Sequence, residues 1–159
     1  MDPEDRVGHH VKRVEQELMA IKNAAVKPSG LTVPQYAALF YLADNPGMSA
    51  AALARACLVT PQSMATVLTN LEAKGLVERS QHPWHKNVLE ARLTEAGATA
   101  LEIADRAATT IERRMSAAFS DDERAQLIAL LHRVSENLHS QAAEIEGGNG
   151  NKALSPFHN

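Results

Sequence analysis

The sequence is poor in the residues that mark several classes of protein. It contains a single cysteine, Cys57, so no disulfide can form within the chain, and aromatic residues make up only 4% of it. No apolar run approaches the roughly 18 residues that a membrane-spanning helix needs. The first residues, MDPEDRVGHH, are acidic and polar, unlike the basic and then apolar start of a secretory signal. We therefore expect a cytoplasmic protein without a disulfide framework or a membrane partner.

Apolar residues account for 45% of the chain, and most of them are Ala, Leu and Val. This composition favours helices over a β-sandwich or a barrel. At 159 residues, the chain fits one domain with an added dimerisation element. The net charge of −3 is uneven, since residues 53–95 carry five basic and four acidic groups and residues 96–159 carry six and nine. We expect a mainly α fold with a weakly basic middle.

Apolar residues recur at helical spacing near both ends of the chain. Over about residues 5–26 they fall at steps of four and three, which is typical of a helix that packs lengthwise on other helices. Two more long helices are predicted over about 95–142, started by Thr94 and by a capping box of Ser120 with Glu123. Their apolar stripes, around Met115 and Leu131, are expected in the core. Residues 143–159 lack the pattern and are expected to form a mobile tail.

Residues 32–75 carry the start signals of three further helices. Thr32 forms a capping box with Gln35, Ser49 caps a short second helix, and Thr60 starts a third helix after only two intervening residues. A short helix, a tight turn and a second helix is the helix-turn-helix pattern. The third helix is two-faced, with Met64, Val67, Leu68 and Leu71 on its apolar side and Gln62, Thr66, Thr69 and Asn70 on its polar side.

Two short strands, LVERS and NVLEARL, are predicted after Gly75 and are joined through residues 81–87. A helix-turn-helix followed by a hairpin is the order of a winged helix-turn-helix, whose second helix enters the major groove of DNA. That groove, about 12 Å wide, admits one α-helix. We therefore predict a winged helix-turn-helix lobe over about 32–94, mainly α with a small β-hairpin, flanked by long dimerisation helices within one domain over 1–142.

The stretch LTVPQYAALFYLADNPGMSAAALARACLVTPQSMATVLTNLEAKGLVER, followed by LTEAG, resembles the MarR family of bacterial transcriptional regulators. The likeness extends over roughly residues 5–142. It implies a homodimer held by the terminal helices, a pseudo-palindromic DNA operator, and often a small phenolic or aromatic effector that relieves repression; no cofactor is expected. Leu58 stands where the family often has glycine, and a left-handed backbone there would cost about 1 kcal/mol.

The first turn of the third central helix is the candidate DNA contact. Its hydroxyls and free N–H groups would hold a phosphate, while Gln62 would pair with a base edge such as adenine. Many members of the family carry arginine where this chain has Thr66 and Asn70, so we expect a different operator. The alternative interpretation is a polar face that meets only solvent. The candidate residues are Thr60, Pro61, Gln62, Ser63, Thr66 and Asn70.

Residues 81–87 would form the tip of the wing. The principal interpretation places His85, Lys86 and Asn87, with His82 beside them, near the minor groove or its phosphates. The family usually reads Asp-x-Arg-Arg here, so weaker phosphate affinity is expected. In a second interpretation the tip is solvated, and Trp84 merely fixes the turn or packs on the lobe. A metal pair of His82 and His85 would lack the further ligands that zinc requires, so no metal is expected.

Four residues are candidate effector contacts, because they lie near where the resemblance places the pocket. His10, Tyr36 and Phe40 would line it, and Arg13 would supply a cation for an aromatic carboxylate. The alternative is that all four are core or dimer-edge residues. Cys57 is expected to be a small buried apolar group in the turn region, not a redox sensor.

Two other classes of function compete with a regulator. An enzyme would need a nucleophile, a base and an orienting group within reach, and the sequence shows neither a phosphate-binding Gly-rich loop nor a nucleophile elbow. We therefore expect no enzyme. A sequence-blind architectural DNA binder or a helical adaptor would use similar helices, but it would lack the preference of about 10³ that a regulator shows for its site.

Overall fold

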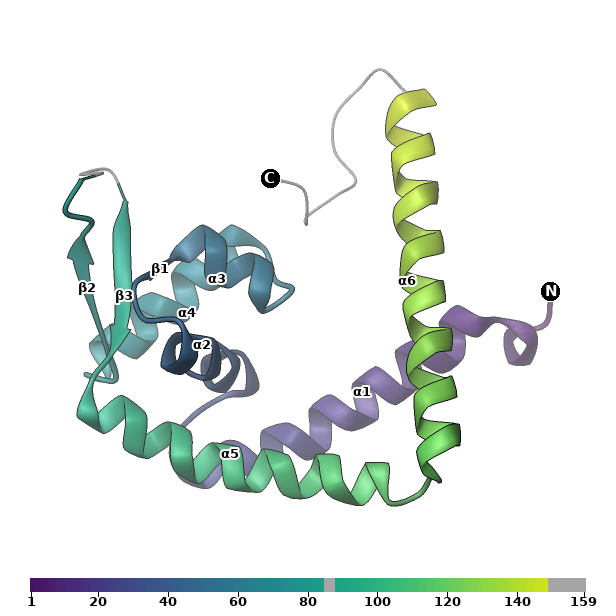
Figure 1. Ribbon diagram of the computed structural model, residues 1–159, viewed down its shortest axis with the longest axis horizontal. Helices are drawn as coiled ribbons and strands as arrows, with labels where there is room; N and C mark the ends of the chain where they lie inside the picture. The colour runs from purple at the N-terminus through teal and green to yellow at the C-terminus, as the bar shows by residue number, and fades with distance from the viewer. Residues whose placement is uncertain (85–87, 149–159) are drawn as a thin grey trace. The chain divides into compact units, whose positions relative to one another are not determined.

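The computed structural model describes residues 1–84 and 88–148. Backbone contacts divide the chain into two units, residues 1–111 and 112–159, and each is described by itself. None of the helices in the described ranges combines the length and the apolar character needed to cross a membrane. The elements in chain order are η1 (Pro3–Asp5), α1 (Val7–Val26), η2 (Lys27–Ser29), α2 (Val33–Asp44), β1 (Met48–Ser49), α3 (Ala50–Ala56), α4 (Pro61–Ala73), β2 (Val77–Gln81), β3 (Leu89–Leu93), α5 (Glu95–Ser116) and α6 (Asp121–Gly148) (Figure 1).

Hydroxyl side chains cap α2, α3 and α5 of the first unit, as the sequence predicts. The Thr32 hydroxyl accepts a hydrogen bond from the Gln35 backbone N–H at 3.4 Å, and the Gln35 side chain accepts one from the Thr32 N–H at 3.1 Å. Ser49 caps α3 at 3.2 Å, and Thr94 caps α5 at 3.0 Å. Each cap satisfies an N–H group that has no partner within its helix. The predicted helix starts are therefore confirmed.

One apolar core joins α2, α3, α4, the sheet and the first half of α5. Its largest members, such as Leu39, Leu53 and Leu71, have an exposed fraction of 0%. Helix α5 contributes the small buried side chains Ala100 and Ala104, which allow its backbone to pack close to the lobe, and the partly buried Leu101. The helix-turn-helix and the hairpin thus rest on a core that this unit completes from its own residues.

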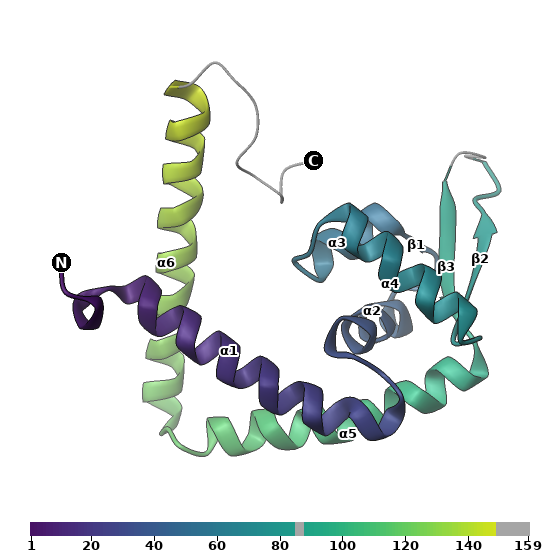
Figure 2. The same cartoon turned by 180° about the vertical axis from the view of Figure 1, so that it is seen from behind.

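The sheet has three antiparallel strands in the order β1-β3-β2. The predicted hairpin is confirmed, with Val77 opposite Leu93. The sequence did not predict β1, because two residues are too few to show an alternating pattern; Met48 pairs with Ala91 on the other edge of β3. From behind, the hairpin rises from the start of α5, and α3 lies on the side of the lobe away from α5 (Figure 2).

A close backbone contact fixes the start of α5 against the turn that precedes β2. Gly75 has a φ of 68° and ends α4, and its carbonyl accepts a hydrogen bond of 2.7 Å from the Thr94 hydroxyl. A Cβ placed on Gly97 would lie 2.0 Å from the carbonyl oxygen of Leu76. Position 97 therefore admits only glycine without a backbone shift.

The second unit contains the end of α5 and helix α6. The capping box at its start is confirmed, since the Ser120 N–H donates to the Glu123 carboxylate at 2.9 Å and the Ser120 hydroxyl accepts from the Glu123 N–H at 3.3 Å. These hydrogen bonds with Ser120, first to its backbone and then to its side chain, lower the pKa of Glu123. Helix α6 continues to Gly148, past residue 142 where the tail was expected to begin, and residues 149–159 lie outside the described part.

The expectation that Met115 and Leu131 belong to the core is wrong for the single chain. Their exposed fractions are 41% and 47%. Helical spacing identifies an apolar face, but it does not say what covers that face. Among the residues that the structure describes, both side chains thus keep close to half of their surface exposed.

Candidate nucleic-acid interface

A tight corner joins α3 to α4. Leu58 has a φ of 55°, so the left-handed backbone considered for this position is confirmed. Two hydrogen bonds hold the corner, from the Leu58 N–H to the Arg55 carbonyl at 3.2 Å and from the Val59 N–H to the Ala54 carbonyl at 3.0 Å. The Leu58 side chain is 74% exposed. The corner thus fixes the angle between α3 and α4.

The start of α4 is organised by a pair of hydroxyls. The Thr60 hydroxyl accepts from the Ser63 N–H at 3.1 Å and donates to the Ser63 hydroxyl at 2.8 Å. Because Thr60 has donated its only hydroxyl proton, it cannot also donate to a phosphate in this arrangement. Ser63 accepts in that bond and keeps its own proton, so Ser63 is the better phosphate donor of the two. Pro61 occupies the first turn, as expected.

Helix α4 turns one face to the core and the other to solvent. The side chains of Met64, Leu68 and Leu71 have exposed fractions of 1% or less. Thr66 is exposed and donates its hydroxyl proton to the Gln62 carbonyl at 3.2 Å, which leaves its oxygen as an acceptor. The candidate residues Pro61, Gln62, Ser63, Thr66 and Asn70 are all exposed, whereas Thr60 is half-buried.

The hairpin is tied to α4 and carries an exposed tryptophan. Arg79 of β2 donates to the Glu72 carboxylate of α4 through Nε at 2.9 Å, and the two side chains form an ion pair. Trp84 is 87% exposed, so the interpretation that it packs on the lobe is wrong. His85, Lys86 and Asn87 lie outside the described residues. Among the residues that the structure describes, no group of three side chains could hold a metal ion.

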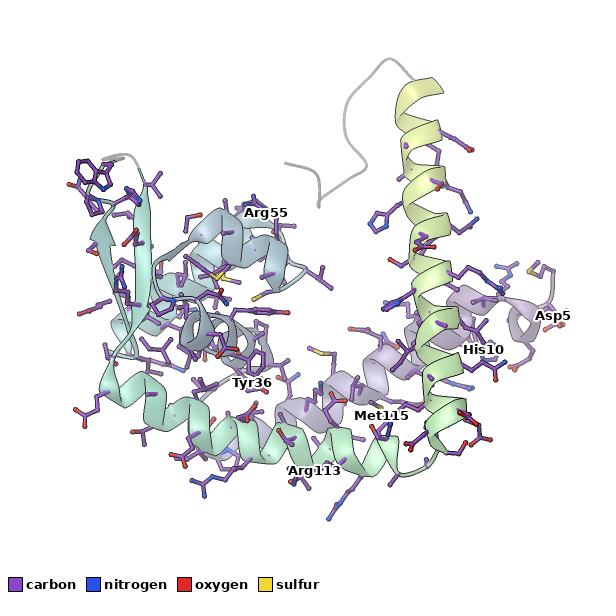
Figure 3. The ribbon with its side chains drawn as sticks, in the orientation of Figure 1. Asp5, His10, Tyr36, Arg55, Arg113 and Met115 are labelled. Carbon is purple, nitrogen blue, oxygen red and sulfur yellow. The ribbon has the colours of Figure 1, made fainter. Side chains whose placement is uncertain are left out.

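The four effector candidates fall into two separate pairs. On α2, the Tyr36 and Phe40 rings lie 6.1 Å apart, and the Tyr36 hydroxyl donates to Asp105 of α5 at 2.8 Å. On α1, His10 Nε2 lies 2.8 Å from the Glu4 carbonyl oxygen, and Arg13 is exposed one turn further along. Helix α1 meets the core at its other end, about 24 Å from His10 at 1.5 Å per residue. One chain therefore does not bring the pairs together, and Figure 3 shows His10 and Tyr36 well apart.

Two polar contacts in this region could not have been found from the sequence. Asp105 meets Tyr36 across 69 positions of the chain. The Lys74 ammonium donates to the Gly30 carbonyl at 2.8 Å and to the Gln35 side-chain oxygen at 3.1 Å, so it ties the end of α4 to the start of α2. Nothing in the local pattern marks either pair, because each depends on how distant helices cross.

Comparison with known proteins identifies the family of this chain. A model of the MarR family matches residues 29–86. The HTH-type transcriptional repressor Rv2887 of Mycobacterium tuberculosis is 33% identical to this chain over 128 residues, which are 80% of this chain and 92% of that protein. The chain belongs to the MarR family. The resemblance seen in the sequence is therefore confirmed, and a MarR chain is a transcriptional regulator.

Solved structures agree with the MarR fold. That of Rv2887 in complex with salicylic acid is 32% identical, has a TM-score of 0.62, and covers 81% of this chain and 96% of its own. The PcaV regulator of Streptomyces coelicolor, in complex with its natural ligand, reaches a TM-score of 0.78 at 24% identity, with 86% and 96% covered. The mainly α winged helix fold predicted from the sequence is confirmed.

Proposed function

We propose that this MarR-family chain is a homodimeric repressor that binds a pseudo-palindromic DNA operator through the outer face of α4. The division of α4 into a buried apolar side and an exposed polar side is the observation that carries the proposal. A helix presented in this way fits a major groove about 12 Å wide. Gln62 reads a base edge, Ser63 and the first N–H groups of α4 hold a phosphate, and Thr66 accepts from a base amine or contacts a thymine methyl.

Apolar stripes on the long helices support the dimer. They have the spacing of helices that pack lengthwise, yet they remain exposed in one chain. Burying both copies of such stripes would supply the driving force for association. The exposed apolar residues are Val7, Val11, Val14 and Ile21 on α1 and Leu127, Ile128, Leu130, Leu131, Leu138 and Ile145 on α6. We assign residues 1–142 to one functional unit, with dimerisation helices at about 5–26 and 95–142 and the DNA-binding lobe at about 32–94.

A small aromatic effector relieves repression in this proposal, as the salicylate bound by the relative Rv2887 suggests. Tyr36 and Phe40 offer the aromatic surface. The Tyr36 hydroxyl already donates to Asp105, so a ligand that takes this bond would loosen the contact between α2 and α5. An effector shifts the repressor only by its difference in affinity for the two states. We place the protein in the cytoplasm and assign it no enzymatic reaction.

Selection of bound fragments from genomic DNA, with and without salicylate, tests this function. A repressor should recover a small set of sites with two inverted half-sites about one helical turn apart, preferred over random DNA by about 10³. Salicylate should lower that recovery. Equal recovery of all fragments would instead favour a sequence-blind architectural binder.

The role of Gln62 has its own test. Gln62→Ala should weaken binding by about 1 to 3 kcal/mol and relax preference at one position in each half-site. Gln16→Ala is the matched control, because Gln16 is an exposed glutamine on α1 opposite the apolar stripe. A loss of the same size on every sequence, measured by competition binding, would contradict base reading by Gln62.

A further inference from the structure

The wing carries a large apolar side chain at an exposed position, where polar residues are more common. Trp84 is the only tryptophan of the chain, and it follows β2 near the end of the hairpin with 87% of its surface exposed. Figures 1 and 2 show this end of the hairpin pointing away from α5. The indole contributes nothing to the lobe core and presents an apolar surface that another molecule could cover.

The backbone beneath Trp84 is braced. The His82 N–H donates to the Val88 carbonyl at 2.8 Å, which extends the hairpin ladder by one bond beyond β2. The Trp84 N–H donates to Nδ1 of His82 at 3.1 Å. With Nδ1 as acceptor, the neutral ring carries its proton on Nε2, which lies 3.5 Å from the Glu90 carboxylate of β3. These two hydrogen bonds hold the backbone that leads from β2 to Trp84.

The cations of the two strands are already engaged within the lobe. Arg79 of β2 pairs with Glu72, and Arg92 of β3 donates to Glu90 at 2.9 Å. A carboxylate beside each guanidinium cancels much of its attraction for a phosphate. A contact made by the strands and Trp84 would thus gain more from apolar burial than from charge.

We propose that Trp84 is an apolar DNA contact, whose indole packs against the deoxyribose edges of the minor groove beside the half-site that α4 reads. The inference rests on the proposed function and goes beyond it by naming this residue and the type of contact. Winged and architectural proteins reach the minor groove with a hairpin or arm, and apolar side chains bury there against sugars and base steps. The hairpin is joined to α4 through Arg79 and Glu72, so the two contacts share one continuous surface.

Substitution at Trp84 separates an apolar contact from a charged one. Trp84→Ala should raise the dissociation constant of the tightest duplex from the genomic selection by roughly tenfold. The factor should be the same at every salt concentration, because the indole displaces no counterion. Trp84→Phe keeps an apolar ring and should recover most of the affinity. Lys86→Ala provides the contrast, since removing a phosphate-binding cation lowers the slope of affinity against salt.

The natural protein supplies a second readout, because its fluorescence comes from one tryptophan. Binding of that duplex should shift the emission of Trp84 and reduce its quenching by acrylamide, while a labelled duplex reports binding independently. Unchanged quenching in the bound complex, or full affinity in Trp84→Ala, would overturn the inference and leave the DNA-binding function intact. Failure of the protein to bind any genomic duplex would overturn both. Because the side chain is exposed, neither variant should alter the thermal unfolding curve.

Discussion

The lobe and helix α6 both contain leucine but use it in opposite ways. In the lobe, Leu39, Leu53 and Leu71 are fully buried, whereas on α6 Leu131 and Leu138 are 47% and 59% exposed. Both segments have apolar faces at regular helical spacing. The lobe buries its hydrophobic residues within one chain, whereas those of α6 would be covered by a second copy in the dimer proposed above.

The largest effect is expected from a charged substitution on the exposed apolar face of α6. Leu131→Glu places a carboxylate where two apolar surfaces should meet, and it should raise the dimer dissociation constant by at least a hundredfold, about 3 kcal/mol. Sedimentation equilibrium measures the change. Ala129→Glu adds the same charge on the opposite face of α6 and should leave the dimer intact. Equal dissociation of both variants would mean that net charge, not the apolar face, governs association.

A smaller effect is expected at the close backbone contact between α5 and the turn before β2. Gly97→Ala forces a Cβ against the Leu76 carbonyl and should lower the free energy of unfolding by about 2 kcal/mol. Gly8→Ala is the control, because no atom lies within 4 Å of a Cβ at that position of α1. It should be neutral or stabilise by up to about 0.5 kcal/mol. Urea denaturation at one protein concentration compares the two variants, and similar midpoints would contradict the close contact at Gly97.

The lobe also contains the half-buried thiol of Cys57. Burial raises the pKa of Cys57 from 9.0 to about 11. At pH 8 the thiolate population is therefore about a hundredfold lower than for a free cysteine, and alkylation by iodoacetamide should be slowed by about that factor. Alkylation at the rate of an unfolded control would show that the lobe does not shield this residue.

The same pKa shift predicts a weak dependence of stability on pH. The folded state favours the protonated thiol, so its contribution is complete below pH 9 and is lost as the pH rises from 9 through 11. Over this range the natural protein should lose slightly more stability than Cys57→Ala, because the variant lacks the titrating group. If urea denaturation shows the same loss of unfolding free energy with pH for both proteins, Cys57 makes no such contribution.

Local chemistry carried most of the fold prediction. The signals are the caps at Thr32, Ser49 and Thr60, the glycine after α4 and the alternating pattern of the hairpin. Each of these signals involves only a few neighbouring residues, so the sequence locates the elements well. Contacts between distant helices, such as Tyr36 with Asp105, depend on crossing geometry that no short pattern encodes. The family resemblance likewise groups His10 with Tyr36 near the effector pocket, and a single chain holds the two residues well apart.

Burial was predictable in direction but not in extent. The spacing around Met115 and Leu131 correctly marks an apolar stripe, and the missing information is which molecule covers it. The exposure of Trp84 was also beyond the sequence, because an indole beside a proline is equally compatible with packing on the lobe.

The left-handed Leu58 has a mechanical consequence for a regulator. An L-amino acid pays about 1 kcal/mol for that backbone, and the turn keeps its shape because the neighbouring amides are already bonded to the end of α3. Sliding α4 along α3 would require unwinding this joint. We therefore expect α3 and α4 to move together as one rigid body.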